Sequence, residues 1–143
     1  MVRLYSRGCE YVIRALAQVN AAKNGKRFSV KEICEKASLP ESYTRKVFQS
    51  LVHSGLFEAW RGPGGGYQFK QSPRRISVLK TIRAIDGDDV LEQCVMGVGK
   101  CRDQESCALH KKWASIKSKF ISEMASVSVE DLIGTKIEEA TKP

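Results

Sequence analysis

The sequence contains no apolar run close to the roughly 18 residues that a membrane-spanning helix requires. Residues 1–10 mix charged and small polar side chains and lack the apolar core of a secretory signal. These two absences predict a cytoplasmic protein without a membrane partner. A chain of 143 residues is long enough to bury a core, so we expect one small domain with an appended element.

Histidine is scarce, with two residues in the whole chain, and no nucleophile–base set is recognisable. The glycine-rich stretch is not followed by the Lys-Ser/Thr pair of a nucleotide-binding loop. The sequence therefore predicts that the protein is not an enzyme. A redox enzyme or electron carrier is the alternative from another class, and only the cysteines support it.

Acidic residues are few in the first part of the chain. The formal charge is +11 over residues 1–83 and −3 over residues 84–143, which together give the net +8. This asymmetry favours an N-terminal part that binds a polyanion. A solvated basic face without a partner is the alternative interpretation.

Three helices are predicted before residue 55. Apolar residues at helical spacing indicate a first helix over 7–22. Ser29 and Glu32 form a capping-box signature at the start of a short second helix. A third helix is predicted over 41–54, and the tight turn before it makes the last two helices a helix-turn-helix.

The third predicted helix has two faces, as expected for a helix that reads DNA. Its apolar stripe, predicted to pack on the other helices, consists of Tyr43, Val47, Phe48, Leu51 and Val52. Donor side chains for bases and phosphates lie opposite. The candidate DNA contacts on this helix are Ser42, Tyr43, Arg45, Lys46 and Gln49.

Two short aromatic-bearing runs, 56–61 and 67–70, flank a glycine-rich turn and predict a β-hairpin. After a helix-turn-helix such a hairpin is a wing, and Trp60 is expected to pack rather than to stack on a base. Glycines allow the backbone to approach phosphate or the minor groove closely. The candidate DNA contacts of the wing are Arg61, Gly64, Gly65 and Gly66.

Three of the five cysteines are close together, in the pattern Cys94-x6-Cys101-x5-Cys107-x2-His110. Three thiolates and an imidazole at this spacing can converge on one metal centre, either iron–sulfur or zinc. Zinc sites usually show paired Cys-x2-Cys knuckles, which are absent here, and an odd cysteine count disfavours a disulfide framework. Cys34 lies on an apolar face and is predicted to be a core residue.

The C-terminal part predicts two further helices. Ser77 caps the first, and the Asp- and Gly-rich segment 86–89 ends it. A long second helix then carries an apolar stripe with a period near 3.5, which favours packing against a second copy of the chain. A core helix within one chain is the alternative. The stripe consists of Leu109, Trp113, Ile116, Phe120, Met124 and Val127.

Taken together, the glycine-rich segment 61–67 and the three-cysteine loop resemble the superfamily of winged-helix repressors that includes the iron–sulfur regulator IscR and the nitric-oxide sensor NsrR. The likeness extends from Arg3 to about Leu132. It implies a homodimer that reads a palindromic operator in double-stranded DNA, with affinity controlled by a redox-sensitive 2Fe–2S or 4Fe–4S cluster. It also implies that Cys94, Cys101 and Cys107 are the cluster thiolates and that His110 is the imidazole ligand.

The chain departs from the familiar patterns of that superfamily in three places. The first cysteine gap is one residue longer than in the IscR-like branch, and Arg45-Lys46 replaces an acidic residue followed by Gln, which leaves the operator sequence open. Cys9 and Glu10 occupy the place where NsrR-like relatives have a carboxylate ligand. Either residue is therefore an alternative fourth ligand, and Cys9 would favour a 4Fe–4S cluster.

The expected fold is mainly α with a small β-hairpin wing, a winged helix-turn-helix followed by a long dimerisation helix. The predicted division is a DNA-binding domain over 1–85, a cluster-binding loop over 86–108, a dimerisation helix over 109–133 and a tail over 134–143.

Overall fold

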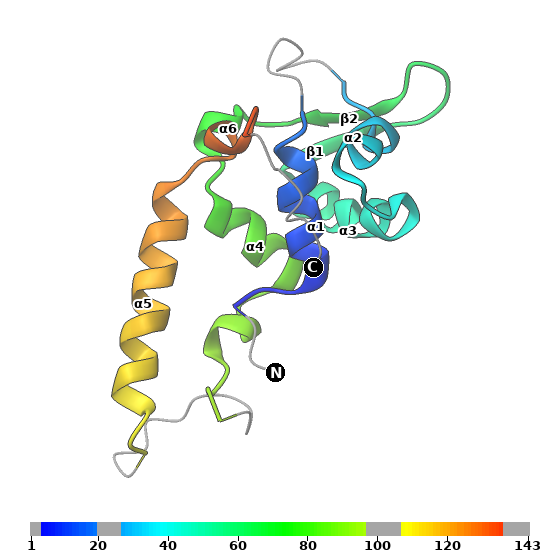
Figure 1. Ribbon diagram of the computed structural model, residues 1–143. Helices are drawn as coiled ribbons and strands as arrows, with labels where there is room; N and C mark the ends of the chain where they lie inside the picture. The colour runs from blue at the N-terminus through cyan, green and yellow to red at the C-terminus, as the bar shows by residue number, and fades with distance from the viewer. Residues whose placement is uncertain (1–3, 20–26, 97–106, 136–143) are drawn as a thin grey trace.

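The structure, a computed structural model, describes residues 4–19, 27–96 and 107–135. It is mainly helical with one two-stranded antiparallel hairpin, as predicted (Figure 1). None of the described helices is long and apolar enough to cross a membrane. The helices are α1 (Arg7–Leu16), α2 (Val30–Ala37), α3 (Glu41–His53), α4 (Val78–Asp86), α5 (His110–Ser126) and α6 (Val129–Leu132). The strands are β1 (Phe57–Trp60) and β2 (Gly66–Phe69), and two short 3-10 helices cover Pro73–Arg75 and Asp89–Glu92.

Local capping signals place the starts of α2 and α4 where the sequence predicts them. The Ser29 hydroxyl accepts a hydrogen bond from the Glu32 backbone N–H at 3.3 Å, and Ser77 does the same for Lys80 at 3.0 Å. Each bond satisfies a backbone donor that would otherwise be free at a helix N-terminus. The turn between α2 and α3 passes through Ser38 in the left-handed region, with φ of 55°.

The predicted first helix over 7–22 is too long, because α1 ends at Leu16. The backbone N–H groups of Gln18 and Val19 bond three residues back, so the chain tightens into a turn that buries Val19. The Gly134 N–H, just after α6, donates to the Ala17 carbonyl at 3.1 Å. A hydrogen bond from a residue distant in sequence therefore satisfies the Ala17 carbonyl at the end of α1. Residues 20–22 of the predicted helix lie outside the described part of the chain.

The main core lies between α1, α2, α3 and the hairpin. Phe48 and Leu51 of α3 and Leu16 of α1 are fully buried. Each such side chain contributes roughly 1.5–3 kcal/mol relative to an exposed one. Aromatic rings of the hairpin complete the core, since Phe57 lies 5.8 Å from Phe48 between ring centroids. This packing fixes the wing against the third helix.

The hairpin pairs Phe57 with Phe69 and Trp60 with Gly66, and Phe28 adds a further bridge beside Tyr67. Gly66 lies at this junction with φ of 140°, and a Cβ there would come within 2.5 Å of the Phe28 carbonyl oxygen. Only glycine fits such a close approach without strain. The Phe28 bridge therefore ties the wing to the segment that precedes α2.

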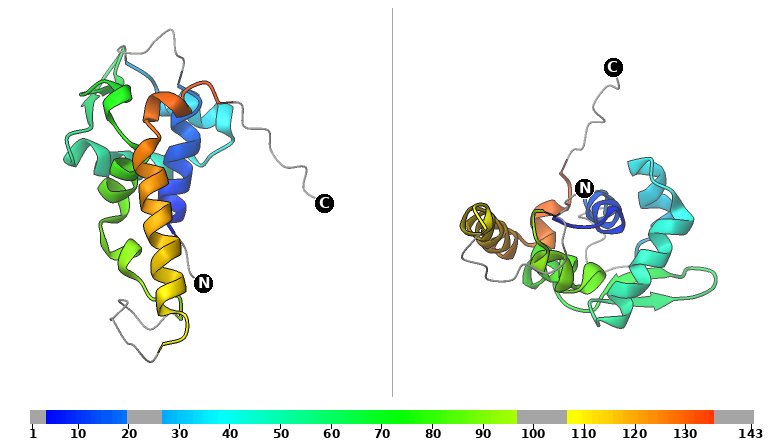
Figure 2. Two further views of the ribbon diagram at one scale, coloured as in Figure 1. Left: turned by 90° about the vertical axis from the view of Figure 1, so that its left-hand side faces the viewer. Right: turned by 90° about the horizontal axis from the view of Figure 1, so that it is seen from below.

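The C-terminal half of α5 packs on its own chain. Phe120, Met124 and Val127 contact a second core cluster that contains Cys9 and Ile82. Figure 2 shows α5 on the far side of α1 from α2 and α3. A helix is confirmed over His110–Ser126, but the predicted helix over 109–133 is interrupted, because Val127 is extended and a new helix, α6, begins at Val129. The apolar stripe also divides: its C-terminal half packs within the chain, whereas its N-terminal half is largely exposed.

The C-terminal end of α5 is also joined to the start of α4. The Val78 N–H donates to the Val127 carbonyl at 2.8 Å, and the Val129 N–H donates to the Ile76 carbonyl at 2.7 Å. These two bonds form an antiparallel bridge between Ser77 and Ser128. The bridge anchors α5 to the helical unit that carries the wing.

Candidate DNA interface and cysteine loop

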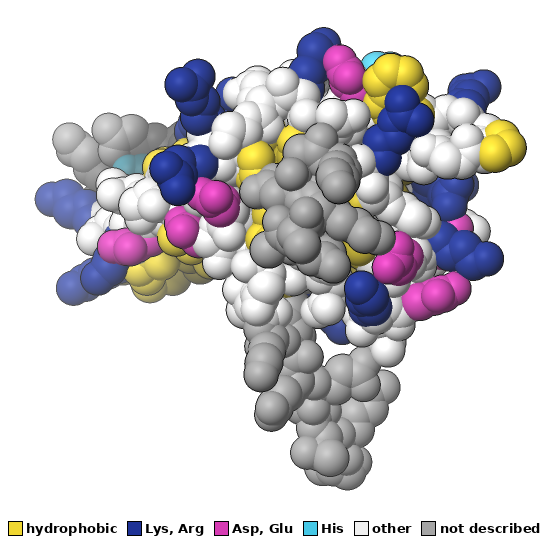
Figure 3. All heavy atoms as spheres, turned by 90° about the horizontal axis from the view of Figure 1, so that it is seen from above, with side chains coloured by type: hydrophobic (Ala, Val, Ile, Leu, Met, Phe, Trp, Pro, Cys, Tyr) yellow, Lys and Arg dark blue, Asp and Glu magenta, His cyan; other side chains and the backbone are white. Residues whose placement is uncertain are grey.

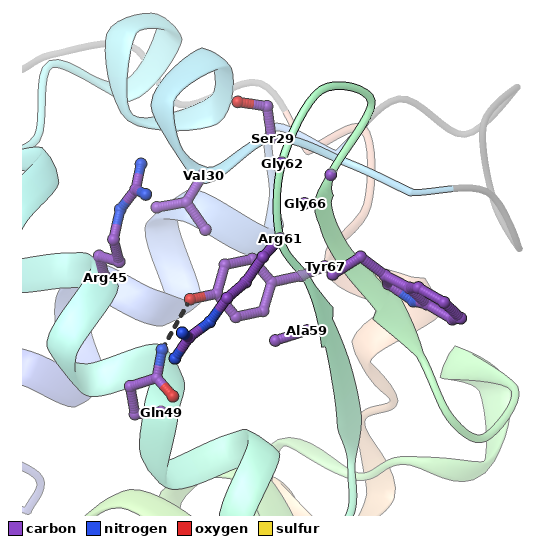
Figure 4. A pocket seen from close by; sticks show the side chains of 11 residues that line it. Ser29, Val30, Arg45, Gln49, Ala59, Arg61, Gly62, Gly66 and Tyr67 are labelled. Atoms are coloured by element: carbon purple, nitrogen blue, oxygen red, sulfur yellow. Dashed lines mark hydrogen bonds between the residues drawn. The ribbon is translucent and has the colours of Figure 1, made fainter.

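A hollow of about 460 Å³ lies between α3 and the wing (Figure 4). None of the described residues that line it carries a carboxylate, and two are arginines. Guanidinium groups suit phosphates and base edges. The lining residues are Ser29, Val30, Arg45, Gln49, Ala59, Trp60, Arg61, Gly62, Gly65, Gly66 and Tyr67.

Five predicted DNA contacts thus come from two elements to one hollow: Arg45, Gln49, Arg61, Gly65 and Gly66. In Figure 4 the side chain of Arg61 extends from the wing toward Gln49 on α3. The Arg45 guanidinium is paired with the Glu41 carboxylate one turn earlier on α3. This pair orients Arg45 and offsets part of its charge before any DNA is bound.

The other predicted contacts of α3 lie on its solvent side. Ser42 and Lys46 are exposed, and Tyr43 is 46 % exposed with its ring edge against Tyr11. Tyr43 thus contacts α1 as predicted for the apolar stripe, but about half of it stays exposed. Thr44, which the stripe does not include, is fully buried, and its hydroxyl donates to the Pro40 carbonyl at 2.8 Å and so needs no water.

Sequence reasoning missed Arg27, which holds the wing in place. The guanidinium of Arg27 lies 3.9 Å from the centre of the Trp60 ring and donates to the Gly64 carbonyl at 3.2 Å. Trp60 is 44 % exposed, so it packs as a cation–π partner rather than in the core. No local pattern links Arg27 to residues that lie more than thirty positions later in the chain.

Basic side chains are spread widely over the surface. Figure 3 shows Lys and Arg around the rim of the face seen from above, including the end with the wing, with acidic groups between them. On this face the basic side chains are exposed, and acidic groups interrupt them. Such a surface attracts a polyanion without forming one unbroken patch.

The cysteine loop is described at its two ends. Cys94 and Cys107 are half-buried free thiols, and Cys101 lies outside the described residues. His110 is the first residue of α5, and its backbone N–H donates to the Cys107 carbonyl at 3.2 Å. Within the described ranges, no three Cys, His, Asp or Glu side chains are gathered as a metal site.

One side-chain bond joins the start of the cysteine loop to α5. The Trp113 indole N–H donates to the Gln93 carbonyl oxygen at 2.8 Å. Gln93, the residue before Cys94, is therefore held one turn from His110, although the two are seventeen positions apart in the sequence. The donor types at these ends, thiol and imidazole, are those that iron–sulfur and zinc centres accept.

Cys9, the alternative fourth ligand, lies in the second core cluster with no exposed surface. Burial, reinforced by the nearby Asp86 carboxylate, raises the pKa of the Cys9 thiol to about 12. A metal binds the thiolate, so this environment disfavours ligation. Glu10, the other alternative, is exposed on α1.

The raised pKa of Cys9 predicts slow alkylation. With a pKa near 12, the thiolate fraction at pH 8 is about a thousandfold smaller than for a thiol of pKa 9, and burial slows attack further. We expect iodoacetamide at pH 8 to modify Cys94 in the native cluster-free protein and to leave Cys9 unmodified, as measured by peptide mass spectrometry. Both should react in guanidinium chloride. Equal native rates for Cys9 and Cys94 would contradict the burial of Cys9.

The fold and the hollow define the class of the protein: a winged helix-turn-helix DNA-binding protein. Within this class, the chain belongs to the Rrf2 family, described as iron-dependent transcriptional regulators, whose profile matches residues 5–135. The resemblance seen in the sequence is thereby confirmed.

Individual relatives agree with this assignment. The IscR transcriptional regulator of Xenorhabdus nematophila is 30 % identical over 132 residues, which cover 92 % of this chain and 79 % of the relative. The structure is similar to that of CymR, the global cysteine regulator of B. subtilis, with a TM-score of 0.72, 24 % identity and coverage of 92 % and 96 %. It is also similar to T. potens IscR, with a TM-score of 0.67, 24 % identity and coverage of 89 % and 83 %. At these identities the two structures support the fold alone.

Proposed function

We propose that this transcriptional regulator is a homodimer that binds a palindromic DNA operator with an affinity set by an iron–sulfur cluster. The proposed cluster is 2Fe–2S, with Cys94, Cys101, Cys107 and His110 as ligands. The observation that carries the proposal is the bond from Trp113 to Gln93, because it holds the Cys94 end of the loop beside the first turn of α5. Three thiolates and one imidazole suit a cluster that gains or loses one electron.

His110 is preferred over Cys9 as the fourth ligand because of their surroundings. Cys9 would have to leave a packed core and lose its proton at a pKa of about 12. His110 begins α5 immediately after the loop that contains the three cysteines. Glu10 is exposed, and a partner subunit could supply it, which makes it the second choice.

DNA recognition is assigned to α3 and the wing. Ser42, Tyr43, Lys46 and Gln49 would approach the major groove from the exposed side of α3, with Arg45 beside them. Arg61 and the backbone at Gly64, Gly65 and Gly66 would contact the adjacent backbone or minor groove. Contacts to phosphate weaken as salt concentration rises, whereas base contacts set the sequence preference.

Dimerisation is assigned to the exposed half of the stripe on α5. Leu109 is 47 % exposed and Ile116 is 55 % exposed, on the same face as Phe120, which is packed within the chain. Large apolar groups in a row on one helix face favour burial against another apolar surface. A second copy of α5 offers the same row.

Signal transfer would run along α5. The cysteine loop adjoins its N-terminal end through Trp113, and the bridge between Ser77 and Ser128 anchors its C-terminal end to α4. A change at the cluster would therefore alter how two copies of α5 pair, and with it the spacing of the two α3 helices. The proposed division of the chain is a DNA-binding domain over 1–85, a cluster-binding loop over 86–108, a dimerisation segment over 109–133 that contains α5 and α6, and a tail over 134–143.

The test is anaerobic purification followed by absorption spectroscopy and analysis of iron, sulfide and zinc. We expect iron and sulfide in equal amounts, two of each per chain, and absorption between about 320 and 460 nm. Fluorescence anisotropy with selected operator DNA should then give different affinities for the cluster-loaded and cluster-free protein. One zinc per chain and no iron, or equal affinities for every operator, would overturn cluster sensing.

A further inference from the structure

Tyr67 lies at the junction of the wing and α3, and its hydroxyl group meets the amide of Gln49. The Gln49 Nε2 group donates to the Tyr67 hydroxyl oxygen at 3.0 Å across the hollow (Figure 4). We propose that Tyr67 is a positioning residue for base recognition: it fixes the Gln49 amide so that Gln49 reads an adenine in the operator. This inference rests on the proposed DNA-binding function and deepens it.

The Tyr67 ring is a rigid support. It is 7 % exposed, lies 5.4 Å from the Phe48 ring and 6.4 Å from the Phe28 ring between centroids, and pairs with Ala59 in the hairpin. Two backbone hydrogen bonds of 2.8 Å to Phe28 hold it from the other side. The hydroxyl group is therefore fixed by both the core and the sheet.

Gln49, in contrast, is an exposed side chain on a helix and has three rotatable bonds. Without a partner its amide would sample many orientations, and binding DNA would have to order it. The hydrogen bond to Tyr67 supplies that order in advance. It also joins the recognition helix to the wing at a point inside the hollow.

The chemistry of the amide favours adenine. A glutamine has two N–H donors and one carbonyl acceptor, so one N–H can bond to Tyr67 while the other N–H and Oε1 stay available. These two groups match adenine, which presents the N7 acceptor and the N6 donor in the major groove. Arg45 and Arg61, which line the same hollow, are donors only and cannot accept from N6.

The test begins with selection of preferred sites from a random-sequence DNA duplex library by the wild-type protein. Affinities of wild type and Tyr67→Phe are then measured for the selected site and for single-base-pair variants of it. We expect Tyr67→Phe to lose preference for adenine at one position of each half-site by about tenfold, which is within the value of one good base contact. Affinity for random DNA, its salt dependence and the melting temperature should stay as in wild type.

The matched control is Tyr5→Phe, which removes a phenol hydroxyl on the side of α5, where the ring stacks on Phe120. It should leave the preference for every base pair unchanged. Gln49→Ala should lose preference at the same position as Tyr67→Phe. In the Gln49→Ala background, Tyr67→Phe should have no further effect, because Tyr67 acts through the amide.

Two results would overturn the inference while leaving the proposed function in place. One is an unchanged base preference in Tyr67→Phe; the other is an equal loss of affinity for all sequences, which would indicate a merely structural hydroxyl. Selection of no preferred site by the wild-type protein is a different result, since it would remove sequence-specific binding itself and the inference with it.

Discussion

Ile116→Glu is expected to convert the proposed homodimer into a monomer and to weaken operator binding by on the order of 10²- to 10⁴-fold, the gain that linking two binding sites provides. Ile116 is 55 % exposed on a stripe whose next member, Phe120, is already packed within the chain. In a dimer a carboxylate at this position would be removed from water without a partner, which costs far more than the lost methyl groups. Light scattering after size exclusion gives the mass, and fluorescence anisotropy gives the affinity.

Ser118→Glu is the control for this substitution. It adds the same charge to α5 two residues later, at an exposed position on the opposite face. We expect it to remain dimeric and to bind the operator as wild type does. An Ile116→Glu protein that stayed dimeric would show that the second copy packs elsewhere.

Cys107→Ser is expected to yield protein without bound iron or sulfide. Serine keeps the size of the side chain and removes the thiolate that we propose holds iron. Its operator affinity should equal that of cluster-free wild type and differ from that of the loaded protein by about 5- to 150-fold, the usual range for coupling between two sites. Metal analysis, the visible spectrum and anisotropy in the absence of oxygen provide the three measurements.

Cys34→Ala is the matched control for the loss of a thiol. Cys34 is buried in the main core on α2, as the sequence predicts, and lies outside the cysteine loop. This variant should keep its iron and its cluster-dependent affinity, with a modest loss of stability. If Cys107→Ser retained the full spectrum and iron content, Cys107 would be excluded as a ligand.

The parts of the fold that the sequence predicts well are those determined by neighbouring residues. The caps at Ser29 and Ser77 act within three positions, and the glycine-rich turn joins two strands that are adjacent in the chain. Side-chain chemistry at short range is enough to place such elements. The helix-turn-helix and the wing follow from them.

The parts that the sequence does not predict depend on contacts between distant segments. The carbonyl of Ala17, just after α1, accepts a hydrogen bond from Gly134, which lies more than a hundred positions later in the chain. The contacts of Tyr67 and Arg27 likewise join residues 18 and 37 positions apart. A periodic pattern within one helix contains no information about such partners. The assignment of the metal ligands and the DNA contacts stays a prediction for the same reason.

The bridge between Ser77 and Ser128 makes α5 a lever with a fixed pivot. A helix of 17 residues is about 25 Å long, so a rotation of about 5° at the pivot displaces its far end by roughly 2 Å. The far end is where Trp113 meets the cysteine loop. In the proposed mechanism, a shift of a bond length or two at the loop would therefore become a small angular change at the other end of α5. The affinity for DNA would thus change with the tilt of α5, and no helix or strand would have to unfold.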